Sequence, residues 1–145
     1  MSEQIYVGAD HAGFDLKQKL VAELTKLGYE PIDVGPTTLD PADDFPDYAK
    51  PVAQAVSDGE VRRGVLTCGT GLGMAYTANR YPHVRAAVVW SPEIAELARK
   101  HNDANILVLP SRFVSEQEGL EILHTWLDTK FEGGRHQRRV EKIEK

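Results

Sequence analysis

Apolar residues along the chain fall into two kinds of stretch, and their alternation predicts strands joined by helices. Residues 5–9 form a short, largely apolar run typical of a buried strand, whereas the apolar positions from Phe14 to Leu27 recur every three or four residues until Gly28. The same succession repeats along the chain. Further strands are predicted at 31–34, 65–68, 86–90 and 106–109, and further helices at about 48–58 and 71–80, then beginning at 91, at 115 and after 134.

Two of these helices carry recognisable start signals. Ser91 followed by Pro92 suits an N-cap and a first helical position, and Ser115 with Glu118 three residues later forms a capping box. In the helix that begins at Ser91, the residues expected to form the buried face are Ile94, Leu97 and Ala98. In the helix that begins at Ser115, the residues expected to be buried are Leu120, Leu123, Trp126 and Leu127.

The apolar runs do not alternate with polar residues, which indicates strands buried on both faces in a parallel sheet covered by helices. We therefore predict an α/β fold, a Rossmann-like three-layer sandwich with a five-stranded parallel sheet, formed as a single domain by residues 1–145. The C-terminal helix has only Val140 and Ile143 as an apolar stripe. Because this stripe is too small to fold alone, we expect the helix to pack on the body or on a partner subunit.

The composition is that of a soluble globular protein, with 41% hydrophobic and 27% charged residues. No apolar stretch is long enough to span a membrane, and residues 1–4 lack the basic and apolar segments of a secretory signal. We therefore expect a cytoplasmic protein without membrane association. The single cysteine excludes an internal disulfide and a cysteine-rich zinc site.

Charge is spread unevenly along the chain. The net charge is −5, but residues 135–145 carry five Lys or Arg against two Glu, which leaves −8 on the remainder. An acidic body with a short basic tail argues against nucleic-acid binding and suits a small anion held by a few arginines. Arg135 and Arg139 are four apart, so on a helix they share a face from which both can bind one phosphate; a solvated basic surface is the alternative.

The only cysteine, Cys68, ends a predicted buried strand and precedes the loop Gly69-Thr70-Gly71-Leu72-Gly73. Glycines let the backbone approach a ligand closely, and the loop N–H groups together with the N-terminus of the following helix favour an anion. The same field favours a thiolate, which makes Cys68 a candidate base or nucleophile. The alternative is a buried, unreactive cysteine beside a tight turn.

Other polar residues are predicted to flank the strands near this loop. In open parallel sheets, ligands bind beyond the carboxyl ends of the strands. Asp10 and His11 follow the first strand, Arg112 follows the fifth, and His101 and Asn102 precede the fifth. We expect these residues to join the cysteine in one site, and Asp10 is also suited to cap a helix.

This constellation suits proton transfer at carbon. Cys68 can remove a proton from carbon while the loop N–H groups stabilise the oxyanion that forms, which is the chemistry of sugar isomerisation through an enediolate. His101 is the candidate for the acid or base that opens the sugar ring, with a solvated histidine at a helix C-terminus as the alternative. Asn102 is a candidate for binding a hydroxyl or oxyanion, and Asp10 and His11 for sugar hydroxyls or a phosphate.

Four other kinds of site are disfavoured by the sequence. Neither glycine cluster is followed by the Lys-Ser/Thr of an ATP-binding P-loop, and the glycine pattern after the third strand is not a dinucleotide fingerprint. Met74 stands where a Cys-x5-Arg phosphatase needs arginine. The five histidines lie far apart in sequence, so no metal site is expected.

Four segments together resemble one known family. They are Gly8–Phe14, Cys68–Gly73 with Ala78-Asn79, His101–Asn105, and Phe131–His136 with Arg139-Val140. In sequence and in order they closely resemble the ribose-5-phosphate isomerase B family, whose relatives include the galactose-6-phosphate isomerase subunits. The resemblance spans nearly the whole chain.

The resemblance implies an aldose-ketose isomerase of pentose phosphate metabolism that acts on a small sugar phosphate and requires no cofactor. In the family, the residue matching Cys68 moves the proton between C1 and C2, and the one matching His101 opens the furanose ring, with Thr70 assisting. The family also implies an active site between two subunits of a homodimer or tetramer. The implied contacts are the amides of Gly69, Thr70, Gly71, Leu72 and Gly73 as an anion hole, Asp10, His11 and Asn102 for the sugar, and Arg112, Arg135 and Arg139 for the phosphate.

Two positions indicate which branch of the family the chain resembles and how it contacts its substrate. One branch lacks the cysteine and uses a glutamate at the position of Met74, so this chain resembles the cysteine branch. Phe45 stands where many members have tyrosine, which bears on how the sugar is contacted. Interconversion of ribose 5-phosphate and ribulose 5-phosphate is expected. The alternatives are a six-carbon substrate, such as allose 6-phosphate or galactose 6-phosphate, and a non-catalytic module that binds a phosphosugar.

Overall fold

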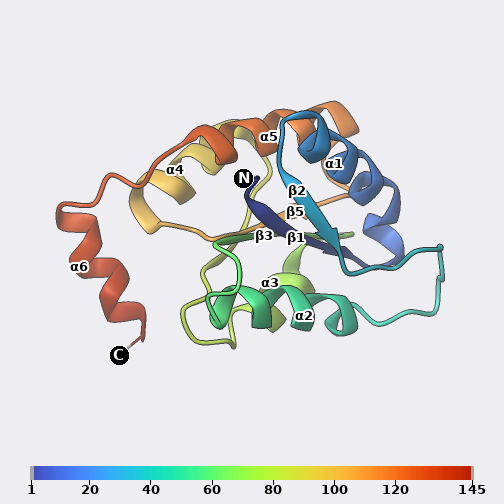
Figure 1. The fold of residues 1–145 in the computed structure, drawn as a ribbon, viewed down its shortest axis with the longest axis horizontal. Helices are drawn as coiled ribbons and strands as arrows, with labels where there is room; N and C mark the ends of the chain where they lie inside the picture. Colours follow the sequence, from blue (N-terminus) through green and yellow to red (C-terminus); the bar gives the residue numbers. More distant parts are fainter. Residues whose placement is uncertain (1, 145) are drawn as a thin grey trace.

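A five-stranded sheet lies at the centre of the computed structural model, which describes residues 2–144 (Figure 1). Its strands are β1 (Gln4–Ala9), β2 (Glu30–Asp33), β3 (Arg63–Cys68), β4 (Ala86–Val88) and β5 (Ile106–Pro110). They run in the order β2-β1-β3-β5-β4, and every neighbouring pair is parallel. The predicted α/β fold with a five-stranded parallel sheet is therefore confirmed.

Helices cover both faces of the sheet (Figure 1). One face carries α1 (Phe14–Lys26), α4 (Pro92–Asn102) and α5 (Glu116–Asp128), and the other carries α2 (Pro46–Ser57) and α3 (Leu72–Ala78). The last helix, α6 (Arg135–Glu141), stands apart from both layers and lies near the C-terminal end of α4. Single 3₁₀ turns at His11–Gly13 and Lys142–Glu144 complete the described chain. No helix within residues 2–144 is both long enough and apolar enough to cross a membrane.

Strand side chains alternate between two apolar layers. Val65 points into the layer beneath α1, α4 and α5, where Trp126 is fully buried, and its neighbour Leu66 points into the layer beneath α2 and α3. Because helices cover both faces, the central strands β1, β3 and β5 are largely buried on both sides. This explains why their apolar runs show no polar alternation.

The helix start signals are confirmed, and one buried face is corrected. Ser91 accepts a hydrogen bond from the Ile94 N–H, and Ser115 and Glu118 form the complete capping box. Leu97, however, is 37% exposed, so its assignment to the buried face of α4 is wrong. The helix is rotated so that Ala95, Ala98 and Arg99 face the core. The apolar spacing did not reveal this rotation, because an arginine is not expected on the buried face of a helix. Arg99 can face the core because its guanidinium donates hydrogen bonds inside the fold, including one to the Ala104 carbonyl.

The C-terminal helix places one of its two apolar residues against the body. Val140 is buried, whereas Ile143 is 59% exposed. Helix α6 packs on the body through its contact with α4. The second half of the predicted apolar stripe faces outward.

The parallel sheet has an amino edge and a carboxyl edge, and the predicted site residues are divided between them. Cys68 ends β3 at the carboxyl edge, whereas α4 ends at Asn102 shortly before β5 begins. His101 and Asn102 therefore lie at the amino edge, about 16 Å away along β3. They do not join Cys68 within one chain, because a residue that precedes a strand lies at the opposite end from one that follows it.

Candidate active site

A cavity of about 210 Å³ opens at the carboxyl edge of the sheet, beside the end of β3. It is lined by Asp10, His11, Ala12, Phe45, Cys68, Gly69, Thr70, Gly73 and Arg112. The fold therefore brings together residues that follow β1, β3 and β5 with one residue at the start of α2. Seven of the residues predicted to form the site line this one cavity.

Cys68 lies at the boundary between the cavity and the apolar core. Its residue is 6% exposed and belongs to the apolar layer beneath α2 and α3, which also contains Met74. The same residue lines the cavity together with Arg112. The cysteine is therefore largely buried, which fits the alternative of an unreactive core residue. It also borders a space that contains a guanidinium group, which fits the interpretation of Cys68 as a catalytic base.

The glycine loop is held in place by β5 and by its own side chains. Gly71 has φ of +78°, a left-handed conformation that favours glycine. The N–H groups of Ser111 and Arg112 donate to the carbonyls of Cys68 (2.9 Å) and Gly69 (3.0 Å). The N–H of Leu72 donates to the hydroxyl of Thr70 at 3.2 Å. One of the amides expected to form an anion hole is therefore already engaged within the loop.

Two side chains pack against the loop where glycine leaves room for them. A Cβ atom at Gly69 would stand 3.1 Å from Nη1 of Arg112, and one at Gly73 would stand 2.7 Å from the ring of Phe45. The guanidinium and the aromatic ring therefore flank the loop. A larger residue at either glycine would displace one of them.

Asp10 makes the cap contact that the sequence suggested, whereas His11 is held by a contact that the sequence did not reveal. Asp10 accepts a hydrogen bond from the Gly13 N–H at 3.1 Å, so it caps the turn that begins α1. His11 donates its backbone N–H to Oδ1 of Asp43 at 3.1 Å, and its Nδ1 lies 2.7 Å from the same oxygen. The hydrogen bond with Asp43, followed by the nearby charge of Asp10, raises the pKa of His11 above its ordinary value.

Ser111 ties the carboxyl ends of three strands together. Its hydroxyl lies 2.8 Å from the carbonyl of Ala12 and 3.2 Å from that of Cys68, so it joins the segments that follow β1, β3 and β5. Neither Ser111 nor Asp43 was singled out from the sequence. A single serine after a strand carries no motif, and Asp43 is one of several acids in the loop 40–45.

The amino edge holds a second group of predicted residues. His101 stacks on His136, with ring centroids 4.4 Å apart and planes 14° apart. Oε1 of Glu132 lies 3.9 Å from Nε2 of His101 and 3.5 Å from Nε2 of His136. Burial, followed by the charges of His101 and Arg135, lowers the pKa of His136.

The two predicted phosphate ligands of the tail belong to this second group. Arg135 and Arg139 are both exposed on α6. Figure 1 shows α6 at the opposite end of the molecule from the carboxyl ends of the strands. One chain therefore carries the two halves of the expected site at opposite edges, with the thiol, the loop and Arg112 on one side and the histidines and basic helix on the other.

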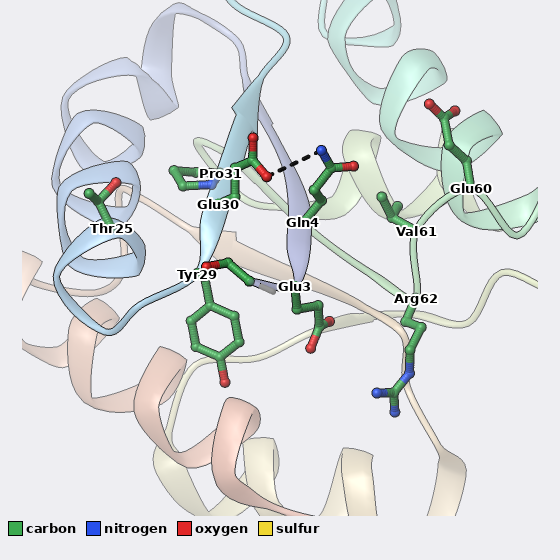
Figure 2. A pocket seen from close by; sticks show the side chains of 10 residues that line it. Glu3, Gln4, Thr25, Tyr29, Glu30, Pro31, Glu60, Val61 and Arg62 are labelled. Carbon is green, nitrogen blue, oxygen red and sulfur yellow. Dashed lines mark hydrogen bonds between the residues drawn. The ribbon is translucent and has the colours of Figure 1, made fainter.

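A larger cavity, of about 970 Å³, lies elsewhere on the amino edge and lacks the chemistry expected of the site. Figure 2 shows Glu3, Glu30, Glu60 and Arg62 around it, with a hydrogen bond between Gln4 and Glu30. It contains no predicted site residue. The smaller cavity is the better candidate because a thiol, a histidine, a guanidinium and backbone N–H groups converge there.

Comparison with known sequences supports one family along the whole chain. A sequence model described as Ribose/Galactose Isomerase matches residues 5–143. Ribose-5-phosphate isomerase B of Escherichia coli (strain K12) is 46% identical over 141 residues, which are 97% of this chain and 94% of that protein. A probable ribose-5-phosphate isomerase B of Mycoplasma pneumoniae is 45% identical over 143 residues, 99% of this chain and 94% of that protein.

Solved structures show the same agreement in three dimensions. A ribose 5-phosphate isomerase of Thermotoga maritima superposes with a TM-score of 0.95 at 46% identity, covering 99% of each chain. Ribose-5-phosphate isomerase B of Mycoplasma genitalium, solved with bound ribulose-5-phosphate, superposes with a TM-score of 0.95 at 43% identity, covering 99% of this chain and 95% of that one. The similarity therefore includes both halves of the candidate site.

Proposed function

The chain belongs to the ribose/galactose isomerase family, and from this membership we propose that it interconverts D-ribose 5-phosphate and D-ribulose 5-phosphate through an enediolate. Relatives named ribose-5-phosphate isomerase B, which align with this chain over nearly their full length, support this assignment. The observation that carries the proposal is the cavity in which Cys68 borders the glycine loop and Arg112. It holds a base, backbone donors and a cation within one small space.

The proposed chemistry begins at the thiolate of Cys68. On the open-chain aldose, the thiolate removes the proton from C2, and the C2–H electrons form a double bond to C1 while the charge moves onto O1. Backbone N–H groups of the loop stabilise this oxyanion. The O2 hydroxyl proton passes to O1, and the thiol returns its proton to C1 as the carbonyl forms at C2, which gives the ketose and regenerates the thiolate.

Ring opening and phosphate binding are assigned to the second half of the site. The proposed roles are proton transfer to the furanose ring oxygen for His101, with Thr70 assisting, sugar contacts for Asp10, His11 and Asn102, and phosphate binding for Arg112, Arg135 and Arg139. Because His101 and the basic helix lie at the amino edge, they are too far from Cys68 to act on the same sugar within one chain. We therefore propose a homodimer, or a tetramer built from such dimers, in which His101 of the partner subunit completes the cavity.

Replacement of Cys68 tests the central step. Cys68→Ala is expected to lower kcat by about 10²–10⁴-fold, the usual contribution of a general base, while binding of the phosphosugar persists. Turnover is measured by the change in ketose concentration, and binding by calorimetry. Circular dichroism of the variant controls for folding. Full turnover by the alanine variant would remove Cys68 from the mechanism.

A panel of substrates distinguishes the proposal from its alternatives. We expect five-carbon sugar phosphates to be turned over faster than allose 6-phosphate or galactose 6-phosphate, because the cavity is small and lined by the bulky Phe45. Faster turnover of a six-carbon sugar phosphate would assign the chain to the other substrate class. Binding without turnover of any of them would identify a non-catalytic module.

A further inference from the structure

Helix α4 ends on an aspartate in a conformation that favours glycine. Asp103, which follows the last helical residue Asn102, has φ of +50° and ψ of +44°. Within residues 2–144, the only other non-glycine residue with a positive φ is His83. Glycine would adopt this left-handed conformation without strain, so an aspartate here indicates that its side chain is needed.

Two arginines hold the carboxylate of Asp103. Nη1 of Arg99 lies 2.8 Å from Oδ1, and Nη2 of Arg85 lies 3.4 Å from Oδ2. Nε of Arg85 also donates to the backbone carbonyl of Asp103 at 2.8 Å. Arg99 comes from α4 itself, and Arg85 stands directly before β4. The aspartate therefore fixes the end of the helix to the start of a strand.

Arg99 connects this clamp to the segment that leads to α6. The arginine is 9% exposed, and its guanidinium also donates to the carbonyls of Ala104 (2.7 Å) and Thr129 (3.2 Å). Thr129 follows the last residue of α5, at the start of the loop before α6. In the same loop, the N–H of Glu132 donates to the carbonyl of Lys100 at 3.1 Å. One buried guanidinium thus joins the end of α4 to the loop that carries α6.

Asn105 holds the segment that follows the aspartate. Its Oδ1 accepts a hydrogen bond from the N–H of Arg85 at 2.7 Å, and its Nδ2 donates to the carbonyl of His83 at 2.8 Å. Its own N–H donates to the carbonyl of Arg85 at 3.0 Å. The segment 103–105 is therefore tied to the segment 83–85 through both side chains and backbone.

The clamp adjoins the amino-edge half of the proposed site, which consists of His101, Asn102, Arg135 and Arg139. His101 and Asn102 directly precede Asp103, and the two arginines lie on α6, beyond the loop that the clamp holds. The side chain of His101 is 41% exposed. An exposed side chain that acts on a substrate in another subunit depends on its backbone for its position. A displacement of about 1 Å can cost about 100-fold in rate.

We propose that Asp103 and Arg99 are positioning residues of the isomerase, which act through His101 and Asn102 by fixing the end of α4. Neither residue touches the substrate. The clamp holds the backbone from which the ring-opening and sugar-binding side chains extend. This inference rests on the proposed function, because it requires His101 of one chain to complete the cavity of another.

Asp103→Asn removes the charge and keeps the shape of the side chain. Asparagine tolerates the left-handed conformation, so the variant adds no backbone strain. Because an amide binds arginine more weakly than a carboxylate does, turnover of ribose 5-phosphate is expected to fall by about 10–100-fold. Glu3→Gln is the matched control. Glu3 pairs with Arg63 at 2.8 Å on the same edge of the sheet, without a predicted site residue, and turnover should stay within about twofold.

Mixed dimers show through which half of the site Asp103 acts. When Asp103→Asn is unfolded and refolded with Cys68→Ala, one of the two sites of a mixed dimer carries neither change. About a quarter of the unmodified activity is then expected. With His101→Ala, each site of a mixed dimer carries one altered amino-edge half, and no activity above that of the separate variants is expected. A general folding defect would give recovery with neither partner.

Arg99→Lys is the second variant and separates geometry from charge. Lysine keeps the positive charge but lacks the planar fork that reaches the Asp103 carboxylate and two carbonyls at once. We expect the same loss of turnover and the same recovery with Cys68→Ala alone. Because Arg99 is buried and its replacement can impair folding, circular dichroism is measured on both variants. Asp103, whose side chain is 33% exposed, gives the decisive result.

The mixture of Cys68→Ala with His101→Ala separates this inference from the proposed function. If that mixture recovers activity, the positioning role alone is overturned by full turnover of Asp103→Asn, by its recovery with His101→Ala, or by its recovery with neither partner. An equal loss of turnover in Glu3→Gln overturns it too. If the mixture of Cys68→Ala with His101→Ala stays inactive, the divided site is wrong, and the positioning role is overturned with it.

Discussion

Asp43 holds His11 through a single carboxylate oxygen, which contacts both the backbone N–H and Nδ1 of the histidine. Its other oxygen is buried and has no hydrogen-bond partner among residues 2–144. The carboxylate therefore fixes the ring and its charge at the rim of the cavity. His11 is positioned by a residue from a loop 32 positions away in sequence.

Asp43→Asn tests this arrangement through the titration of His11. The hydrogen bond to Asp43 raises the pKa of His11, so the asparagine variant is expected to return that pKa toward its ordinary value. The raised pKa contributes stability that is fully present below pH 6.5 and is lost as the pH rises through the folded-state pKa. Nuclear magnetic resonance of the imidazole C–H protons measures the change. An equal pKa in both proteins would show that Asp43 does not govern the charge of His11.

Site residues were predictable from sequence where the signal was local. Cys68 was found because an apolar run ends beside three glycines, and both features are read directly from neighbouring positions. Asp43 and His136 were missed because their roles come from contacts with residues far away in the chain. The chemistry of a side chain is local, whereas its partners are set by tertiary packing.

Among the elements, α1 is anchored to the sheet by a buried charge. Lys17 is fully buried, and its Nζ lies 2.9 and 2.8 Å from the two carboxylate oxygens of Asp33 and 2.7 Å from the carbonyl of Pro36. The lysine thereby joins α1 to the end of β2 and to the loop that follows. Helical periodicity does not reveal such a position, because a lysine is expected on the solvated face.

Lys17→Met is expected to lower the free energy of unfolding by about 2–4 kcal/mol, because methionine keeps the stem but leaves Asp33 and the Pro36 carbonyl without their donor. Urea denaturation followed by circular dichroism measures the loss. Lys19→Met is the matched control, since Lys19 is exposed on the same helix and its replacement should change stability by less than about 0.5 kcal/mol. Equal stabilities of the two variants would show that the buried pair does not anchor the helix.

Most elements followed from the sequence, and the exceptions have a common cause. Five strands, the helices between them and two helix caps were predicted because apolar spacing and cap residues act over a few positions. Trp90, predicted inside a strand, lies beyond the end of β4 and is 57% exposed. The position of Trp90 depends on β4 being an edge strand that pairs only with β5. The order of strands in a sheet cannot be predicted from the spacing of apolar residues.

At the scale of the whole molecule, the division of the site predicts that two inactive variants complement each other. In a mixed dimer of Cys68→Ala and His101→Ala, one of the two sites carries both changes and the other carries neither. Random reassociation is expected to restore about a quarter of the activity of the unmodified protein. The mixture is prepared by unfolding and refolding the two variants together.

Refolding each variant alone is the control, and neither should recover turnover. A mixture that also stays inactive would place Cys68 and His101 in the same site of one chain, against the separation of the two edges of the sheet. Residue spacing placed His101 before the fifth strand but did not show that this puts the histidine at the opposite edge from Cys68. Only the family resemblance implied a site between two subunits.

Because the thiol and the basic helix lie at opposite edges of one chain, a sugar phosphate held by both bridges two molecules. Substrate binding and subunit association are then thermodynamically linked, and each strengthens the other by the same factor. A dilute preparation would lose specific activity as its subunits separate, and saturating sugar phosphate would delay that loss. The concentration of the protein thus becomes one of the variables that set its rate.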